Sequence, residues 1–165
     1  MRFLRTYAPG FEEAYLLDIA AQVGVRETRR IVGDYQLTEQ DVLDCASFDD
    51  TVGVNGWMIE EHLAGDVQFR WQNIPHCRGF NHLPYRMLLP QGLSNVLVAG
   101  RCASMTHGGQ SAARVSGACF VMGQAAGTAA SLAVQAGLSP RDLEVSRLQS
   151  VLSSHGVYLG LDQAQ

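Results

Sequence analysis

The sequence has little charge and no excess of positive residues. Of its 165 residues only 17% are charged, and the formal net charge is -4. A protein that neutralises the phosphates of DNA or RNA needs a basic surface, so we do not expect a nucleic-acid partner. The apolar share of 47% is ordinary for a globular protein, and the length allows one domain with its own hydrophobic core.

The sequence also lacks paired cysteines. Its four cysteines stand far apart, without a C-x-x-C motif. This spacing argues against a zinc knuckle and against a compact disulfide scaffold. We expect reduced thiols and a cytoplasmic location. The cysteines are Cys45, Cys77, Cys102 and Cys119.

No secretory signal is visible, because no apolar run follows the arginines in Met1–Gly10. Val115–Ala136 carries no charge and is long enough to cross a bilayer as a helix. However, it consists mostly of small and weakly polar residues, which drive insertion less than large aliphatic ones do. We therefore expect a buried helix in a tight core and no contact with a membrane.

Hydrophobic periodicity and turn residues predict most of the other elements. Phe11–Val23 has the apolar stripe of an amphipathic helix. Thr28–Thr38 resembles a strand interrupted by a bend or bulge, and Thr38 is a suitable N-cap for a following helix. Glycine and proline breaks predict short strands and loops in Phe48–Pro90. Leu143–His155 is expected to be a short final helix.

The most informative unit is a predicted strand, loop and helix. Val96–Ala99 is an apolar run that suits a strand buried on both faces, and Gly100 and Arg101 follow it. The small-residue loop Cys102–Ala113 then leads into the uncharged helix. A helix start offers unpaired N–H groups and a partial positive charge to an anion.

Glycines in that helix have two interpretations. Gly117, Gly123 and Gly127 remove side-chain bulk, so we expect a sheet or a second helix to pack close to the backbone. Tight packing alone explains this pattern as well as a ligand does. No G-x-x-x-x-G-K-[ST] motif is present, so a phosphate-binding NTPase loop is not supported.

Three ordered blocks nevertheless resemble the closing motif of FAD-dependent oxidoreductases of the two-dinucleotide-binding type. They are Val96–Ser104, Ala113–Gly117 and Met122–Ala130, and the similarity extends upstream through Arg26–Tyr35 and Leu83–Pro90. The resemblance implies an α/β fold, or α+β for the isolated chain. It implies that 1–86 is part of the substrate or cap region and that 87–165 is the C-terminal part of the FAD-binding domain.

The resemblance also implies a cofactor and a partner. The flavin would be contacted by Gly100, Arg101, Val115, Ser116 and Gly117. The G-x-G-x-x-G turn by which such proteins bind the ADP half of FAD does not occur in this sequence. We therefore expect the C-terminal part of an oxidoreductase that is inactive alone and acts on a small-molecule substrate. It would join an N-terminal FAD-binding segment or another chain, and an oligomer is among the expected assemblies.

Two residues are predicted to take part in catalysis. His107 lies in the loop before the helix, and histidine is the side chain that ordinarily changes charge near neutral pH, so this position suits proton transfer. Arg86, with Arg29 and Arg30, has a guanidinium that suits a carboxylate substrate, although surface or structural pairing with an acid is the more common role of any single arginine. Cys102 could be a reactive thiol or a small buried residue.

No metal site is expected, because the spacing of the remaining candidate ligands matches no usual set. Those candidates are His62, His76, His82 and Cys77. A second function stays open beside the oxidoreductase hypothesis. The chain would then be a non-catalytic, truncated module that associates with another chain through an exposed apolar face.

Overall fold

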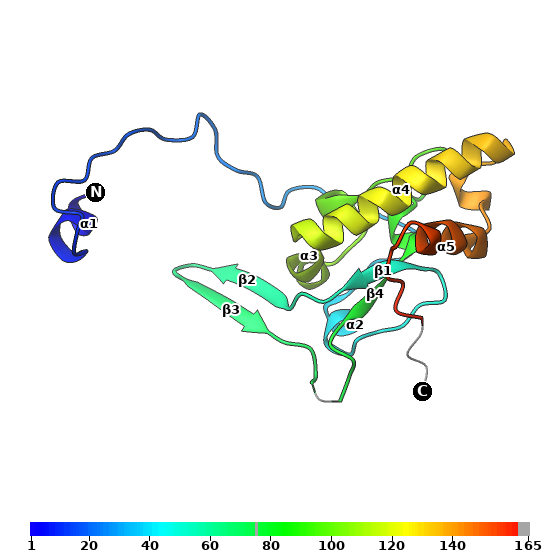
Figure 1. Ribbon diagram of the computed structural model, residues 1–165, viewed down its shortest axis with the longest axis horizontal. Helices are drawn as coiled ribbons and strands as arrows, with labels where there is room; N and C mark the ends of the chain where they lie inside the picture. Colours follow the sequence, from blue (N-terminus) through cyan, green and yellow to red (C-terminus); the bar gives the residue numbers. More distant parts are fainter. Residues whose placement is uncertain (75, 162–165) are drawn as a thin grey trace.

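The computed structural model describes residues 1–74 and 76–161, which form a body with an N-terminal arm that extends away from it (Figure 1). The helices are α1 (Arg2–Tyr7), α2 (Glu39–Leu43), α3 (His107–Ala113), α4 (Ser116–Ala136) and α5 (Val145–Ser154). The strands are β1 (Thr51–Asn55), β2 (Ile59–Leu63), β3 (Asp66–Arg70) and β4 (Asn81–Pro84). Short 3-10 helices span Tyr85–Leu88, Gly100–Cys102 and Pro140–Asp142.

The strands pair in antiparallel ladders beneath the long helix. β1 pairs with β4, whereas β2 and β3 form a hairpin that projects from the body (Figure 1). α4 packs along β1, and α5 packs against both. The core contains Val52, Leu83, Met122 and Leu148, all fully buried. The mixed α/β class is thus confirmed. One hydrophobic core contains residues from both sides of position 86. The predicted domain boundary between 1–86 and 87–165 stays a prediction.

Several local predictions are confirmed. The four strands lie within Phe48–Pro90, as expected. Thr38 caps α2 in a capping box: its Oγ1 accepts from the Asp41 N–H at 3.2 Å, and its own N–H donates to Asp41 Oδ2 at 2.8 Å. α4 ends at Gly137, whose φ of 65° lies in the left-handed region that favours glycine. α5 lies within the range predicted for the final helix.

The predicted loop before α4 is partly wrong, because its second half forms helix α3. Thr106 caps this helix, with its Oγ1 accepting from the Gly109 N–H at 3.1 Å. The expected compactness is confirmed at two glycines. A Cβ at Gly108 would lie 2.5 Å from Glu39 Oε2, and one at Gly109 would lie 2.3 Å from the Leu37 carbonyl oxygen. Small residues here serve close packing within a helix.

Two predicted strands are wrong as regular elements. Val96–Ala99 is half-buried and joins no ladder in the described part of the chain, although the Val98 N–H donates to the Leu88 carbonyl at 2.9 Å. Thr28–Thr38 contains only single bridges, from Gly33 to Pro90 and from Leu37 to Met105, on either side of the predicted bend. A strand needs a neighbour to pair its backbone, which an apolar run alone does not supply.

The amphipathic helix predicted for Phe11–Val23 is also wrong. This segment is extended, and its apolar side chains are exposed, with Leu17 at 85% and Val23 at 88%. An amphipathic stripe stabilises a helix chiefly by packing against a core. The described body offers this segment no such surface, since the arm runs away from it (Figure 1).

Helix α4 is only partly the buried helix that we predicted. One side packs into the core through Ala118, Met122, Ala125, Ala129, Leu132 and Ala133. The other side is exposed, and a Cβ at Gly117, Gly123 or Gly127 would meet nothing within 4 Å. By length and composition alone α4 is also a candidate membrane span, a test that core helices pass as well.

The expectation of free thiols is wrong for two cysteines. Cys45 follows α2, and Cys77 lies in the connection between β3 and β4; they form a disulfide with a Cα–Cα distance of 5.9 Å. Cys102 and Cys119 are free. The sequence separation of 32 residues gives no local sign of this pairing, which depends on the return of the chain after the β2–β3 hairpin. Such a bond stabilises the fold by restricting the unfolded chain.

Candidate functional site

The start of α4 has free hydrogen-bonding capacity. Val115 is the N-cap and offers no side-chain hydrogen bond, and the first bond of the helix runs from the Cys119 N–H to the Val115 carbonyl at 3.0 Å. The N–H groups of the first turn therefore have no acceptor in the helix itself. Because α4 is long, its dipole adds a partial positive charge at this end. The first turn can receive an electron-rich group.

The predicted flavin contacts gather around this turn. Gly100 has a φ of 76°, and a Cβ there would lie 3.8 Å from Cys119 Sγ in the first turn of α4. Arg101 and Val115 line one hollow, and Val115 and Gly117 line another. Ser116 begins the helix between them. The structure thus brings all five residues to one end of α4.

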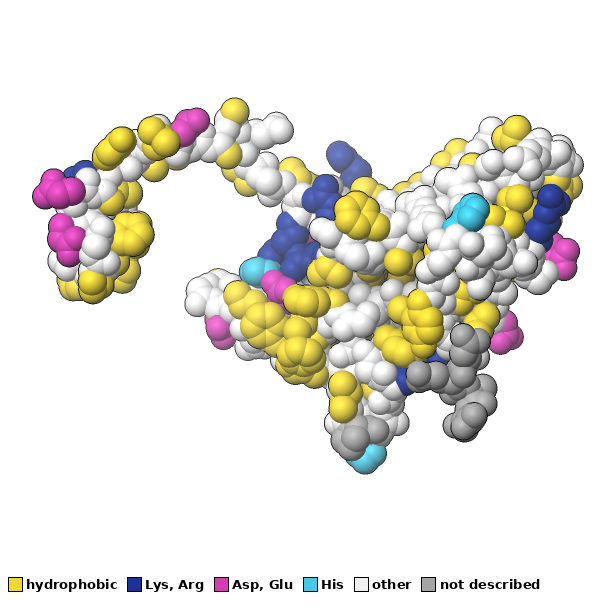
Figure 2. All heavy atoms as spheres, in the orientation of Figure 1, with side chains coloured by type: hydrophobic (Ala, Val, Ile, Leu, Met, Phe, Trp, Pro, Cys, Tyr) yellow, Lys and Arg dark blue, Asp and Glu magenta, His cyan; other side chains and the backbone are white. Residues whose placement is uncertain are grey.

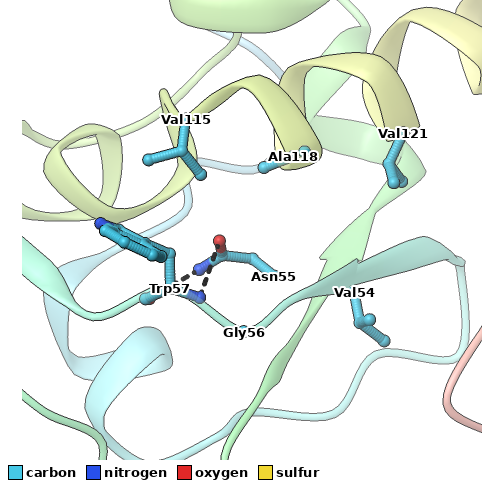
Figure 3. A pocket seen from close by; sticks show the side chains of 8 residues that line it. Val54, Asn55, Gly56, Trp57, Val115, Ala118 and Val121 are labelled. Carbon is cyan, nitrogen blue, oxygen red and sulfur yellow. Dashed lines mark hydrogen bonds between the residues drawn. The ribbon is translucent and has the colours of Figure 1, made fainter.

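An apolar hollow of about 490 Å³ lies between α4 and the end of β1 (Figure 3). Figure 3 shows Val115, Ala118 and Val121 on the helix side, with Trp57 opposite Val115. Asn55 fixes the bend before Trp57, because its Nδ2 donates to the Trp57 carbonyl at 3.2 Å and its Oδ1 accepts from the Trp57 N–H at 3.3 Å. The lining residues are Val54, Asn55, Gly56, Trp57, Val115, Gly117, Ala118 and Val121.

A second hollow, of about 460 Å³, has a positive lining, and we call it the arginine hollow. Figure 2 shows basic side chains gathered where the arm joins the body. Arg114 donates from Nη2 to the Glu60 carbonyl at 3.1 Å. Burial, and then the nearby charge of Arg26, lower the pKa of Arg114. The lining residues are Gly24, Val25, Arg26, Glu60, His62, Arg101, Arg114 and Val115.

His107 lies at the edge of a third hollow, of about 490 Å³, at the start of α3. Its Nδ1 donates to Glu27 at 3.0 Å, and its side chain is 61% exposed. Glu39 faces the same hollow and forms a salt bridge with Arg70, whose hydrogen bond holds the pKa of Glu39 below its ordinary value. A histidine with one nitrogen held by a carboxylate and its ring accessible to solvent is suited to proton transfer.

The structure does not bring Arg86 to these hollows. Its guanidinium binds Asp50 through two hydrogen bonds, of 2.9 and 3.1 Å, and lies over the Tyr35 ring. The hydrogen bonds that Arg86 donates to Asp50 raise the pKa of Arg86. Burial, and then the hydrogen bond that Tyr35 donates to Asp41, raise the pKa of Tyr35 to about 12. Arg30, the neighbouring candidate for a carboxylate substrate, forms a salt bridge with Glu27. The candidate reactive cysteine, Cys102, is an exposed free thiol.

Among the described residues no three His, Cys, Asp or Glu side chains gather as a metal site. His62 binds Glu60 at 2.8 Å, and the buried His82 bonds to the backbone of Phe48 and Gly160.

Sequence reasoning missed three contributors to these hollows: Trp57, Glu27 and Arg114. Arg114 stands inside one of the motif blocks, directly before Val115, and this position was the one signal that could have identified it. Nothing in the sequence links Glu27 to His107, since 80 residues separate them.

Comparison with known proteins gives one match. The family model described as FAD dependent oxidoreductase matches residues 1–152 of the chain. No curated protein and no solved structure matches it.

Proposed function

This chain belongs to the family of FAD-dependent oxidoreductases, and from that membership we propose that it supplies the isoalloxazine side of a flavin site and part of the substrate pocket. The observation that carries the proposal is the uncapped start of α4, open on one side to an apolar hollow that suits a planar ring. Gly117 lets a ring approach the backbone, because nothing lies within 4 Å of the position of a Cβ there.

The residues present fit this half of the cofactor. The N–H groups of Ser116 and Gly117 offer hydrogen bonds to the polar edge of the ring, and Val115 and Trp57 offer apolar contact. Bound FAD would supply the capacity to accept a hydride or an electron pair from a substrate. The start of α4 would favour negative charge on whatever group lies against it.

His107 is the proposed proton-transfer residue of the site. Glu27 binds His107 Nδ1 at 3.0 Å, and Nε2 takes no part in this bond. A carboxylate partner of this kind fixes the orientation of the ring and the nitrogen that faces the carboxylate. His107 would hold or release one proton as the substrate is oxidised or reduced, which is the role of a general acid or base.

The ADP half of FAD would be bound by a G-x-G-x-x-G segment outside this sequence, in the same protein or in another chain. The exposed side of α4 supports this part of the proposal, because it carries glycines and alanines that a neighbouring backbone can approach closely. The same exposed side favours the second function, a non-catalytic module that associates with another chain. In either case α4 is a packing helix, supported by its buried stripe, and not a membrane span.

The proposed site can be tested by filling the hollow. Gly117→Leu places a side chain at the α4 start, and we expect FAD affinity of the full protein to fall at least tenfold, measured by quenching of flavin fluorescence. Ser153→Leu, which adds the same side chain at an exposed position of α5, should leave FAD affinity unchanged. Equal FAD binding by the wild-type full protein and its Gly117→Leu variant would place the flavin elsewhere. A wild-type full protein without any FAD affinity would favour the non-catalytic module.

The cytoplasmic location is part of the proposal and needs a separate test. The free thiols of Cys102 and Cys119 accord with a reducing cytoplasm. Cell fractionation should recover the protein together with a cytoplasmic marker. Recovery with an extracytoplasmic marker would contradict this location and would accord with the Cys45–Cys77 disulfide.

A further inference from the structure

Three arginines line the arginine hollow together, and none of them is paired with an acidic side chain among the described residues. The sequence contains no lysine, so all twelve side-chain cations other than histidine are guanidinium groups. Arg30, Arg70, Arg86 and Arg141 each form a salt bridge with an acidic side chain. In the described part of the chain, none of the three arginines of the hollow does so.

Backbone carbonyls hold two of the three guanidinium groups in place, and the third arginine is held through its main chain. Arg101 donates from Nη1 to the Val25 carbonyl, and Arg114 donates from Nη2 to the Glu60 carbonyl at 3.1 Å. Arg26 is held through its own backbone, because its carbonyl accepts from Gln110 Nε2 at 3.4 Å. These bonds position the groups without neutralising their charge. Unneutralised guanidinium groups beside a hollow are suited to bind a planar oxyanion through two parallel hydrogen bonds.

The opposing groups do not cancel this charge. Glu60 is the acidic residue of the lining, and its carboxylate is engaged by His62 Nε2 at 2.8 Å and by Trp57 Nε1 at 3.3 Å. The hollow therefore holds three guanidinium groups against one carboxylate. Arg26 and Arg114 line the same hollow, and the charge of Arg26 adds to burial in lowering the pKa of Arg114, so two like charges face each other there. An anion in the hollow would relieve that repulsion.

We propose that the arginine hollow binds the carboxylate group of the substrate, through Arg26 and Arg114 with Arg101 beside them. This inference rests on the proposed function, since it assigns a substrate class to the same site. The position supports a substrate over the phosphates of the cofactor. Val115 lines both this hollow and the apolar one proposed for the flavin ring. Glu27, the next residue after Arg26, binds His107, so a carboxylate held here lies beside both the ring site and the proton-transfer residue.

The test is a calorimetric titration of the full chain with succinate at constant ionic strength, with uncharged succinamide as the matched ligand. We expect succinate to bind and succinamide not to bind. Arg26→Gln and Arg114→Gln should each weaken succinate at least tenfold, the usual scale for one charge-assisted hydrogen bond. Arg26→Lys keeps the charge but loses the guanidinium that forms two parallel hydrogen bonds, so it should recover part of the affinity for succinate. Arg147→Gln, at an exposed arginine of α5 outside any salt bridge of the described residues, is the control.

The outcomes separate the inference from the proposed function. Arg114 is partly buried, so Arg26→Gln on the exposed connection gives the decisive result if Arg114→Gln fails to fold. Unchanged succinate binding in both variants, or equal binding of succinamide, would overturn the substrate assignment. A loss of FAD affinity in both variants with unchanged succinate affinity would also overturn it, because the arginines would then bind the cofactor. Succinate binding that depends on Arg26, in a complete protein that includes the G-x-G-x-x-G segment and still lacks FAD affinity, would refute the flavin proposal and leave the anion site in place.

Discussion

Helices α3 and α4 are both rich in small residues, yet the structure uses their glycines in opposite ways. In α3, Gly108 and Gly109 are buried against Glu39 and Leu37, with no room for a Cβ. In α4, Gly123 and Gly127 face outward, with open space around the position of a Cβ. The same sequence feature thus marks close packing in one helix and an exposed face in the next.

Glycines in a helix therefore indicate close packing of a second element against the helix only where that second element is identified. The partner of α3 is the segment around Leu37, which Thr38 and its capping box hold in place. For the outward side of α4, none of the described elements takes that role. The inward side of α4 packs without glycine, through alanines and Met122. Adding or removing side-chain atoms on each side of the two helices should therefore change stability by very different amounts.

The largest effect is expected for Gly109→Ala. Its Cβ would lie 2.3 Å from the Leu37 carbonyl oxygen, which is backbone and cannot rotate away. The cost should be about 4 kcal/mol of unfolding free energy, above the usual range for overpacking, because the segment carrying Leu37 must shift. Denaturant unfolding of both proteins measures it. A loss below about 1 kcal/mol would show that α3 is not packed as closely as described.

The next effect compares the two sides of α4. Met122 is fully buried, and Met122→Ala should cost about 3 kcal/mol through lost contact and the cavity that remains. Phe120 is 76% exposed, so Phe120→Ala should change stability by less than about 0.5 kcal/mol. Thermal unfolding of the two variants is the measurement. Equal losses would mean that the outward side of α4 is covered in solution.

Local chemistry made some of these features predictable from the sequence. Thr38 with Asp41, and Gly137 after an uncharged run, are signals that act over a few residues, and both were read correctly. Val96–Ala99 and Phe11–Val23 failed because a strand or an amphipathic helix is stabilised by a distant partner. The residues proposed to contact the flavin come from family resemblance and stay a prediction, whereas nothing in the sequence indicated the arginine hollow, because it depends on Gly24–Arg26 crossing near Arg114.

The contrast between closed and open regions extends to two histidines. His82 is buried: its Nδ1 accepts from the Phe48 N–H at 3.0 Å, and its Nε2 donates to the Gly160 carbonyl at 3.3 Å, so the fold requires the neutral ring. Burial, and then the charge of Arg78, lower the pKa of His82 below its ordinary value of 6.5. Below pH 6.5 the unfolded chain therefore takes up a proton that the folded chain does not.

We expect the unfolding free energy to fall as the pH is lowered from 6.5 towards the pKa of the folded state. Each unit between the two pKa values is worth about 1.4 kcal/mol. Denaturant unfolding between pH 7 and pH 5 measures the slope, and His82→Asn should reduce it. His155→Gln is the matched control, because His155 is exposed at the end of α5 and forms no salt bridge among the described residues, and this variant should keep the wild-type slope. The same slope in His82→Asn and wild type would contradict the assignment to His82.

The smallest effect, and the most informative about assembly, is expected for Gly127→Ala. In the chain alone this change should raise the unfolding free energy by about 0.5–1 kcal/mol, because alanine restricts the unfolded chain and meets no neighbour in the helix. In a complete flavoprotein the same change should be unfavourable and should lower FAD affinity, since a methyl group would separate α4 from the segment proposed to bind the ADP half of FAD. Measuring unfolding of the chain alone and FAD affinity of the full protein for one variant tests both statements. Stabilisation without any loss of FAD affinity would show that the outward glycines of α4 face solvent in the assembled protein as well.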